Sequence, residues 1–176
     1  MADKSRLNPS TMLRLRVALL GALLAAVPPA THAANNCPWI NEATASGLLG
    51  ADAVGSFTDA TAAQPAVCTF IQEELGTTRT LRITVMDTPE FRALLDSETK
   101  ACATPASPLI ALGNEAIACS GDDRKKLYAE RVVGRVRNQV FTITLSTTRK
   151  DDSILTRSEL KLRILVAAEQ VSGNLF

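Results

Sequence analysis

The sequence ERVVGRVRNQVFTITLST, residues 130 to 147, decides the fold of this chain, because it has the pattern of two β-strands joined by a tight turn. Apolar and polar residues alternate in both halves, as in strands that show one face to a core and the other to water. A two-residue turn at residues 138 and 139 pairs Val136 with Phe141 and gathers the apolar side chains on one face. A turn at residues 137 and 138 keeps the same faces, so both turn positions remain open. A three-residue loop would instead turn Arg135 toward the apolar row of the partner strand.

The other face of this hairpin carries arginine and threonine side chains. Arg82, on a second strand with alternating apolar residues, extends that face if the two strands share one core. A guanidinium group presents planar donors that suit carboxylates and phosphates, so the face predicts attraction for an anionic group. The alternative is the ordinary polar side that antiparallel sheets show to water. The candidate binding residues are Arg82, Arg131, Arg135, Arg137, Thr142 and Thr144.

Residues 1 to 33 have the pattern of an export signal. Basic residues precede an apolar run over residues 17 to 27, and small residues follow it. That run is far shorter than the roughly 20 residues of a membrane-spanning helix, which disfavours a retained anchor. The pattern is already complete from Met12, so the sequence does not decide whether translation starts there or at Met1. We expect a periplasmic or secreted protein with no membrane span after signal removal and no lipid on Cys37.

The expected mature chain, residues 34 to 176, is slightly acidic. It keeps 15 of the 19 basic residues and 17 of the 18 acidic residues, a net charge of −2. The basic surface typical of nucleic-acid-binding proteins is therefore not indicated. The single histidine, His32, belongs to the leader, so the mature chain has no group for a Ser-His or Cys-His mechanism. It also lacks the commonest ligand of zinc and haem, and we expect neither a metal site nor a cofactor.

Four cysteines follow the leader, Cys37, Cys68, Cys102 and Cys119, which predicts two disulfides in an exported protein. No C-x-x-C pair is present, so metal knuckles and thioredoxin-like redox chemistry have no support. Four cysteines allow three connectivities. We predict that Cys37 pairs with Cys68 and Cys102 with Cys119, because these pairs join neighbouring elements of the predicted order.

The remaining segments predict three helices and three further strands. The helix-start signals are Asn41, Thr88-Pro89-Glu90 and the capping box Thr156-x-x-Glu159. Residues 54 to 57 are a candidate short edge strand. The helices are expected over residues 41–49, 88–102 and 156–171, and the strands over 67–72, 79–86 and 116–119, besides the hairpin. The order α-β-β-α-β-β-β-α predicts one α+β domain over residues 34 to 176, with a mostly antiparallel five-stranded sheet and helices on one face.

Three groups of residues carry a resemblance to known proteins. They are Cys37-Pro38 before the first helix, Cys68 at the first strand, and Pro108-Leu109 followed by Leu112-Gly113-Asn114-Glu115-Ala116. In these features the chain resembles small secreted bacterial proteins of unknown function, a group that includes mycobacterial-type lipoproteins with a PsbP-like fold. The resemblance covers most of residues 37 to 176. The chain departs from it by lacking the lipid-attachment cysteine and by adding Cys102 and Cys119. The resemblance implies a fold and a compartment but no uniform activity.

The sequence favours an exported, non-enzymatic binding or interaction module. Its partner would be an anionic ligand or an envelope protein that meets the arginine and threonine face. One alternative is a hydrolase that uses carboxyl groups in both catalytic roles, and another is an envelope protein with a structural role. A cleft that holds two carboxyl groups in opposed environments would favour the hydrolase, whereas an open sheet face would favour binding.

Overall fold

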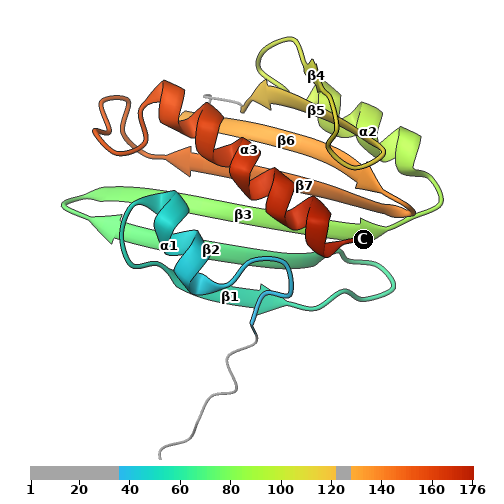
Figure 1. Ribbon diagram of the computed structural model, residues 1–176, viewed down its shortest axis with the longest axis horizontal. Helices are drawn as coiled ribbons and strands as arrows, with labels where there is room; N and C mark the ends of the chain where they lie inside the picture. Colours follow the sequence, from blue (N-terminus) through green and yellow to red (C-terminus); the bar gives the residue numbers. More distant parts are fainter. Residues whose placement is uncertain (1–35, 122–127) are drawn as a thin grey trace, which may run out of the picture. The chain divides into compact units, whose positions relative to one another are not determined.

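The computed structural model describes residues 36–121 and 128–176 (Figure 1). The predicted leader, residues 1 to 33, and most of the charged turn predicted at residues 120 to 126 lie outside the described residues. The described elements are, in order, α1 (Glu42–Leu49), β1 (Val54–Thr58), β2 (Ala66–Glu74), β3 (Thr77–Asp87), α2 (Phe91–Lys100), β4 (Ser107–Leu109), β5 (Glu115–Ser120), β6 (Tyr128–Val136), β7 (Gln139–Thr147) and α3 (Arg157–Asn174).

The strands form one antiparallel sheet in the spatial order β1-β2-β3-β7-β6-β5-β4 (Figure 1). The predicted α+β class and antiparallel sheet are confirmed, but the sheet has seven strands instead of five, and the element order differs accordingly. The two additional strands are the two edges of the sheet. Strand β1 confirms the candidate edge strand at residues 54 to 57, whereas the sequence did not indicate β4. Both are short, and β4 contains Pro108, which is tolerated in edge strands. Strand β4 has only three residues and none of them is buried, so its sequence lacks the alternation that reveals the central strands.

The hairpin of β6 and β7 turns at Arg137 and Asn138, the second of the two positions that the sequence left open. Gly134 therefore lies opposite Phe141, and Val136 lies opposite Gln139. The apolar and polar faces are those that the sequence predicts. A side chain at Gly134 would overlap the ring of Phe141, so this register depends on a glycine at that position.

One face of the sheet forms the main core together with α1 and α3. The Asn41 side chain caps α1 by accepting from Thr44 N at 2.8 Å, and Thr156 caps α3 by accepting from Glu159 N at 3.3 Å. The predicted caps of α1 and α3 are therefore present. The predicted Cys37–Cys68 disulfide is confirmed and ties the segment before α1 to β2. The largest fully buried side chains of this face include Leu81, Ile83, Phe141, Ile143, Leu145 and Val132 from the sheet, with Leu49 from α1 and Ile164 from α3.

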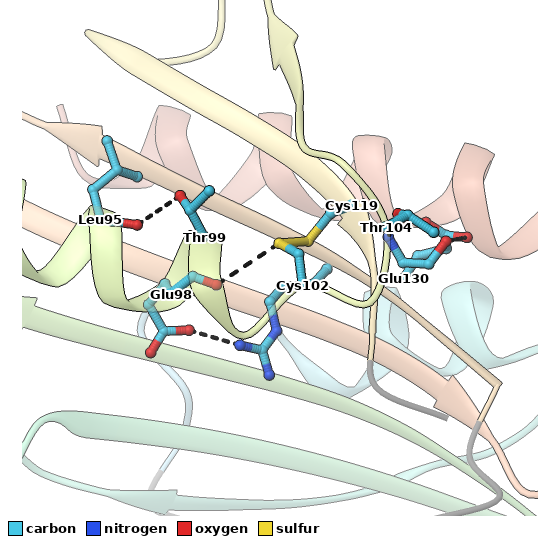
Figure 2. The surroundings of a disulfide bond; sticks show 9 residues. Leu95, Glu98, Thr99, Cys102, Thr104, Cys119 and Glu130 are labelled. Carbon is cyan, nitrogen blue, oxygen red and sulfur yellow. Dashed lines mark hydrogen bonds and ion pairs between the residues drawn. A yellow bond between two sulfur atoms is a disulfide. The ribbon is translucent and has the colours of Figure 1, made fainter. Parts of the chain in front are cut away.

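Helix α2 lies on the opposite face, which corrects the prediction that all helices share one face. It contacts β6 and β7, and Figure 2 shows it in front of the sheet with α3 behind. The predicted Cys102–Cys119 disulfide is confirmed and ties the end of α2 to β5 (Figure 2). Helix α2 packs on this face because of Val133 and Val140. These two valines belong to the polar face, yet they are 0% and 2% exposed. Two apolar side chains on that face need a cover, and α2 supplies it.

Helix α2 is also the least buried of the described helices. It begins at Phe91, after the predicted start at residues 88 to 90, and no side chain caps it. Its apolar residues Phe91, Leu94 and Leu95 are half-buried instead of buried as predicted. None of the helices in residues 36–121 and 128–176 is long and apolar enough to cross a membrane.

Candidate functional site

Helix α2 divides the arginine and threonine face that the sequence predicts. Arg131 of β6 donates from Nη1 to Glu98 Oε2 of α2 at 2.8 Å (Figure 2). Arg135 donates from Nε to Glu115 Oε1 at 3.0 Å, and its guanidinium lies 4.1 Å from the ring centroid of Phe91. Both guanidinium groups are therefore half-buried beside α2 and already face a carboxylate. This part of the face is not open.

The other candidate residues are spread over two places. Arg82 of β3 is exposed, and it lies in one cross-strand row between Thr69 and Thr144. Thr142 lies on the same side of β7 and is half-buried like Thr144. Arg137 lies in the β6–β7 turn, where its backbone N–H donates to Asn114 Oδ1 at 2.7 Å. The uncovered part of the sheet face therefore holds exposed Arg82 with half-buried Thr142 and Thr144, and Arg137 is exposed in the turn.

A ligand-sized hollow lies elsewhere, at the end of the sheet where β5 ends, β6 begins and α3 begins. Its volume is about 620 Å³, within the range of roughly 300 to 1,000 Å³ of small-molecule pockets. A second hollow of about 220 Å³ adjoins it and shares Thr104, Ser120 and Glu130 with it. We call the larger hollow the Glu130 cavity. Its described lining consists of Ala103, Thr104, Ser120, Gly121, Tyr128, Ala129, Glu130, Lys150, Leu155, Arg157 and Leu160.

Glu130 is the buried acid of this cavity. The residue is only 6% exposed, and its Oε1 accepts a hydrogen bond from the Ser120 hydroxyl at 3.1 Å. Burial raises the pKa of the Glu130 carboxyl, while the Ser120 hydrogen bond and the positive charges of Lys161 and Arg157 limit the rise. An acid with a raised pKa that lines a cavity is typical of functional sites.

The Cys102–Cys119 disulfide holds one wall of the cavity in place (Figure 2). Directly after Cys102, the backbone N–H of Ala103 donates to the carbonyl of Ser120 at 3.0 Å. The N–H of Ser120 donates in turn to Thr104 Oγ1 at 3.0 Å. The segment after α2 is therefore fastened to the end of β5, beside Glu130.

Positive groups lie at the rim of the same cavity. Lys150 comes from the β7–α3 loop and Arg157 is the first residue of α3, and both are exposed. The first turn of a helix also carries a partial positive charge from its unpaired N–H groups. Leu155 and Leu160 add apolar surface to the lining. The exposed bases of this lining can attract an anionic group.

A second buried carboxyl, Asp152, has the opposite environment. Arg79 donates to both of its oxygens, from Nε at 2.7 Å and from Nη2 at 2.9 Å. The Thr147 hydroxyl and the backbone N–H groups of Ile154 and Leu155 donate to it as well. Burial alone would raise the pKa of Asp152, but these hydrogen bonds hold it well below its ordinary value.

The two carboxyl groups do not line the same described hollow. Asp152 lines a different hollow, together with Arg79 and Glu74. Glu130 is the only carboxyl among the described residues that line its cavity, and the aspartates at positions 122 and 123 lie outside the described residues. The described geometry therefore does not assemble the pair of acids that the hydrolase alternative requires.

Sequence reasoning missed Glu130 as a site residue, although one signal was present. Glu130 shares the core-facing side of β6 with Val132 and Val136, where a carboxyl is unusual. The other wall residues gave no signal, because Thr104, Ser120 and Arg157 are far apart in the sequence. Among the described residues, no group of three or more potential metal ligands comes together.

Comparison of the chain with family models, with curated proteins and with solved structures found no match. The resemblance to small secreted bacterial proteins with a PsbP-like fold therefore stays a prediction. The site has to be interpreted from its own chemistry.

Proposed function

We propose that this protein is an exported, non-enzymatic binding protein that holds a small ligand with an anionic group in the Glu130 cavity. The observation that carries the proposal is the convergence of Lys150 and Arg157, from two different elements, on one ligand-sized hollow. Two disulfides in a chain of this size support export, because such bonds form and persist outside the cytoplasm.

The anionic preference is the one that the sequence suggests, but the proposed site is different. Arg131 and Arg135 already pair with Glu98 and Glu115, so an anion would have to displace a carboxylate from each. Lys150 and Arg157 are exposed and line a concave surface. A concave site removes more of a small ligand from water than a flat sheet face does.

The proposal is tested by titrating the exported protein, disulfides formed, with small carboxylates and phosphates and following backbone NMR shifts. We expect the largest shifts at Leu155, Arg157 and Ala129. Arg157→Gln should weaken binding about tenfold, because one charge-assisted hydrogen bond contributes about 1.5 kcal/mol. Arg149→Gln is the matched control, because Arg149 pairs with exposed Asp151 and does not line the cavity. Equal losses in both variants, or shifts confined to other surfaces, would contradict the proposal.

The uncovered part of the sheet face is the second candidate, favoured by the exposed position of Arg82 between two threonines. An anionic protein surface suits it, because Arg82 is exposed on a sheet face. Arg82→Ser should then weaken capture of envelope partners and reduce the salt dependence of that capture. Unchanged capture would leave Arg82 as solvated surface.

A further inference from the structure

None of the described helices packs on the outward side of β1, β2 and β3. Helices α1 and α3 cross the other side of the sheet, and α2 packs against β6 and β7 (Figure 1). We call the outward side of these three strands the open face. It carries two charged side chains, Arg82 and Glu73, and both are exposed. Neither belongs to the ion pairs that the described residues form. The open face therefore has one base and one acid that can contact another surface.

An apolar pair lies between these two charges. Val54 of β1 and Ile71 of β2 are cross-strand neighbours, and they are 77% and 42% exposed. Ile71 lies in turn beside Thr80 of β3. We call this row of three residues the central row. Covering two adjacent apolar side chains removes them from water, which favours contact with a second surface.

The two charges lie on opposite sides of the central row. Arg82 comes two residues after Thr80 on β3, and Glu73 comes two residues after Ile71 on β2. Because β2 and β3 are antiparallel, these two steps lead in opposite directions, each about 7 Å from the central row. Arg82 therefore lies in the row of Thr69, and Glu73 lies opposite Thr78. A rotation by 180° about the central row exchanges the positions of the base and the acid, so the open face is complementary to itself.

We propose that the open faces of two copies of this chain pack against each other across a twofold axis along the central row. The proposal rests on the second candidate function above, because the anionic protein surface that Arg82 meets is here the Glu73 of the second copy. Two such ion pairs flank Val54 and Ile71 of both chains. Each residue of the interface then contacts its complement in the other copy, as a closed twofold dimer requires.

Helix α2 does not obstruct this packing. Its Glu98 pairs with Arg131, which lies in the row of Arg82. Its Phe91 lies against Arg135, still further from the central row. The twofold axis carries the second α2 to the other side of the central row, so the two helices do not meet. A helix is about 10 Å thick, which matches the separation of two packed sheets.

The overlap of the two faces is small. Three residues of β2 follow Ile71 and three residues of β3 precede Thr80, so the strands overlap over about 20 Å around the axis. The four strands from β1 to β7 give a width of about 20 Å. Two such surfaces bury about 800 Å² in total, the size of weak and transient interfaces. We therefore expect a dissociation constant between about 10 µM and about 1 mM.

The experiment follows self-association of the exported protein, disulfides formed, by sedimentation equilibrium and backbone NMR. The fraction of dimer should rise between about 10 µM and about 1 mM. The NMR shifts that change with concentration should include those of Ile71, Thr80 and Arg82, and they should not include those of α3.

Charge reversal identifies the surface. Arg82→Glu and Glu73→Arg should each weaken the dimer about tenfold, because each variant places two pairs of like charges in contact. An equal mixture of the two variants should recover the wild-type affinity. In the mixed dimer one contact is the original ion pair, and the other joins the new carboxylate to the new guanidinium. This recovery is specific to a twofold arrangement that pairs positions 82 and 73.

The apolar centre has its own variant. Ile71→Ser should weaken the dimer, because it removes apolar surface at the axis. Ile110→Ser is the matched control, because Ile110 is 95% exposed but lies in the β4–β5 loop. Lys161→Glu is the control for charge reversal, because Lys161 is exposed on α3, on the other side of the sheet. Both controls should dimerise like the wild type, and all variants should unfold at the same urea concentration as the wild type.

The outcomes distinguish this proposal from the second candidate function. If the protein stays monomeric up to about 1 mM while Arg82→Ser weakens capture of envelope partners, the twofold dimer is wrong and the second candidate stands. If the protein is monomeric and Arg82→Ser changes no capture, both are wrong. If a dimer forms but the mixture of the two charge variants does not recover its affinity, or the controls weaken it equally, another surface forms the dimer and the proposal is wrong.

Discussion

Asp152 and Glu130 are two carboxyl groups with nearly equal burial, 4% and 6% exposed, at the same end of the same sheet. Asp152 accepts from Arg79, Thr147 and two backbone N–H groups, and its pKa is lowered. Glu130 accepts from Ser120, lines a cavity, and its pKa is raised. Burial alone therefore does not separate a structural acid from a candidate functional one. The two kinds of acid differ instead in the number and charge of the hydrogen-bond donors around the carboxyl group.

The completed network around Asp152 fastens the β7–α3 loop to the sheet. Arg79 reaches it from β3 and also donates to Gln72 of β2 at 2.7 Å. Thr147 reaches it from the end of β7. The Asp152 carboxylate thus links the β7–α3 loop directly to β3 and β7, and through Arg79 to β2. Lys150 belongs to the same loop. The structural acid positions part of the proposed site.

The largest expected effect is that of Asp152→Ala. Removing one partner of a buried ion pair leaves Arg79 uncompensated, so the free energy of unfolding should fall by about 3–5 kcal/mol at pH 7. Urea unfolding measures it. Asp151→Ala is the matched control, because that neighbour is exposed and pairs only with Arg149 in the described structure, and it should change stability by less than about 0.5 kcal/mol.

The effect of Asp152→Ala should depend on pH in a defined direction. A carboxyl whose folded pKa is lowered stabilises the fold above its unfolded pKa, near 3.8, and that stability is lost as the pH falls toward the folded pKa. The free energy of unfolding of the wild type should therefore approach that of the variant as the pH falls below about 4. A constant difference across this range would contradict an ionised Asp152 as the source of the stability.

The next effect concerns the wall beside Glu130. Replacing Cys102 and Cys119 together by serine opens a loop with a sequence separation of 17, which should cost about 3 kcal/mol. Because Ala103 and Ser120 are joined next to this bridge, their amide protons should exchange faster in the variant. Replacing Cys37 and Cys68 should cost a similar amount without accelerating exchange at Ser120. Equal exchange at Ser120 in both variants would show that the bridge does not hold the wall.

A smaller effect is expected on the opposite face of the sheet. Arg131→Ser with Arg135→Ser removes the partners of Glu98 and Glu115, each half-exposed, so thermal unfolding should show a loss of about 1–2 kcal/mol in total. Arg82→Ser should leave stability unchanged, because Arg82 is exposed. If the substitutions at all three positions leave stability unchanged, the packing of α2 does not depend on these ion pairs.

The sequence predicts what depends on neighbours along the chain. The period of two in β6 and β7 gives the two faces, and Asn41 and Thr156 mark helix starts. These features are fixed by local geometry, and the structure confirms them. Both predicted disulfides are confirmed as well, although β1 and β4 lie between the elements that they join.

What the sequence does not predict depends on partners that the fold brings together. Arg79 and Asp152 are separated by 73 residues and meet only because β3 lies beside β7. The Glu130 cavity needs residues from β5, β6, the β7–α3 loop and α3 at once. The side on which α2 packs follows from two valines on the polar face, a signal weaker than the alternation around it.

The smallest expected effect is that of Glu130→Gln, which should not lower the free energy of unfolding as Asp152→Ala does. It is the most direct test of the contrast between the two carboxyl groups. Burial raises the folded pKa of Glu130, so ionising it costs stability as the pH rises from its ordinary value of 4.5 through the folded pKa. Glu130→Gln removes that cost, so we expect the free energy of unfolding of the variant at pH 7 to equal or slightly exceed that of the wild type. At pH 4 the two should be alike, because a protonated Glu130 is neutral like glutamine. Urea unfolding at both pH values provides the measurement. A loss of several kcal/mol, like that of Asp152→Ala, would show that Glu130 is a structural acid, and the contrast between the two carboxyl groups would fail.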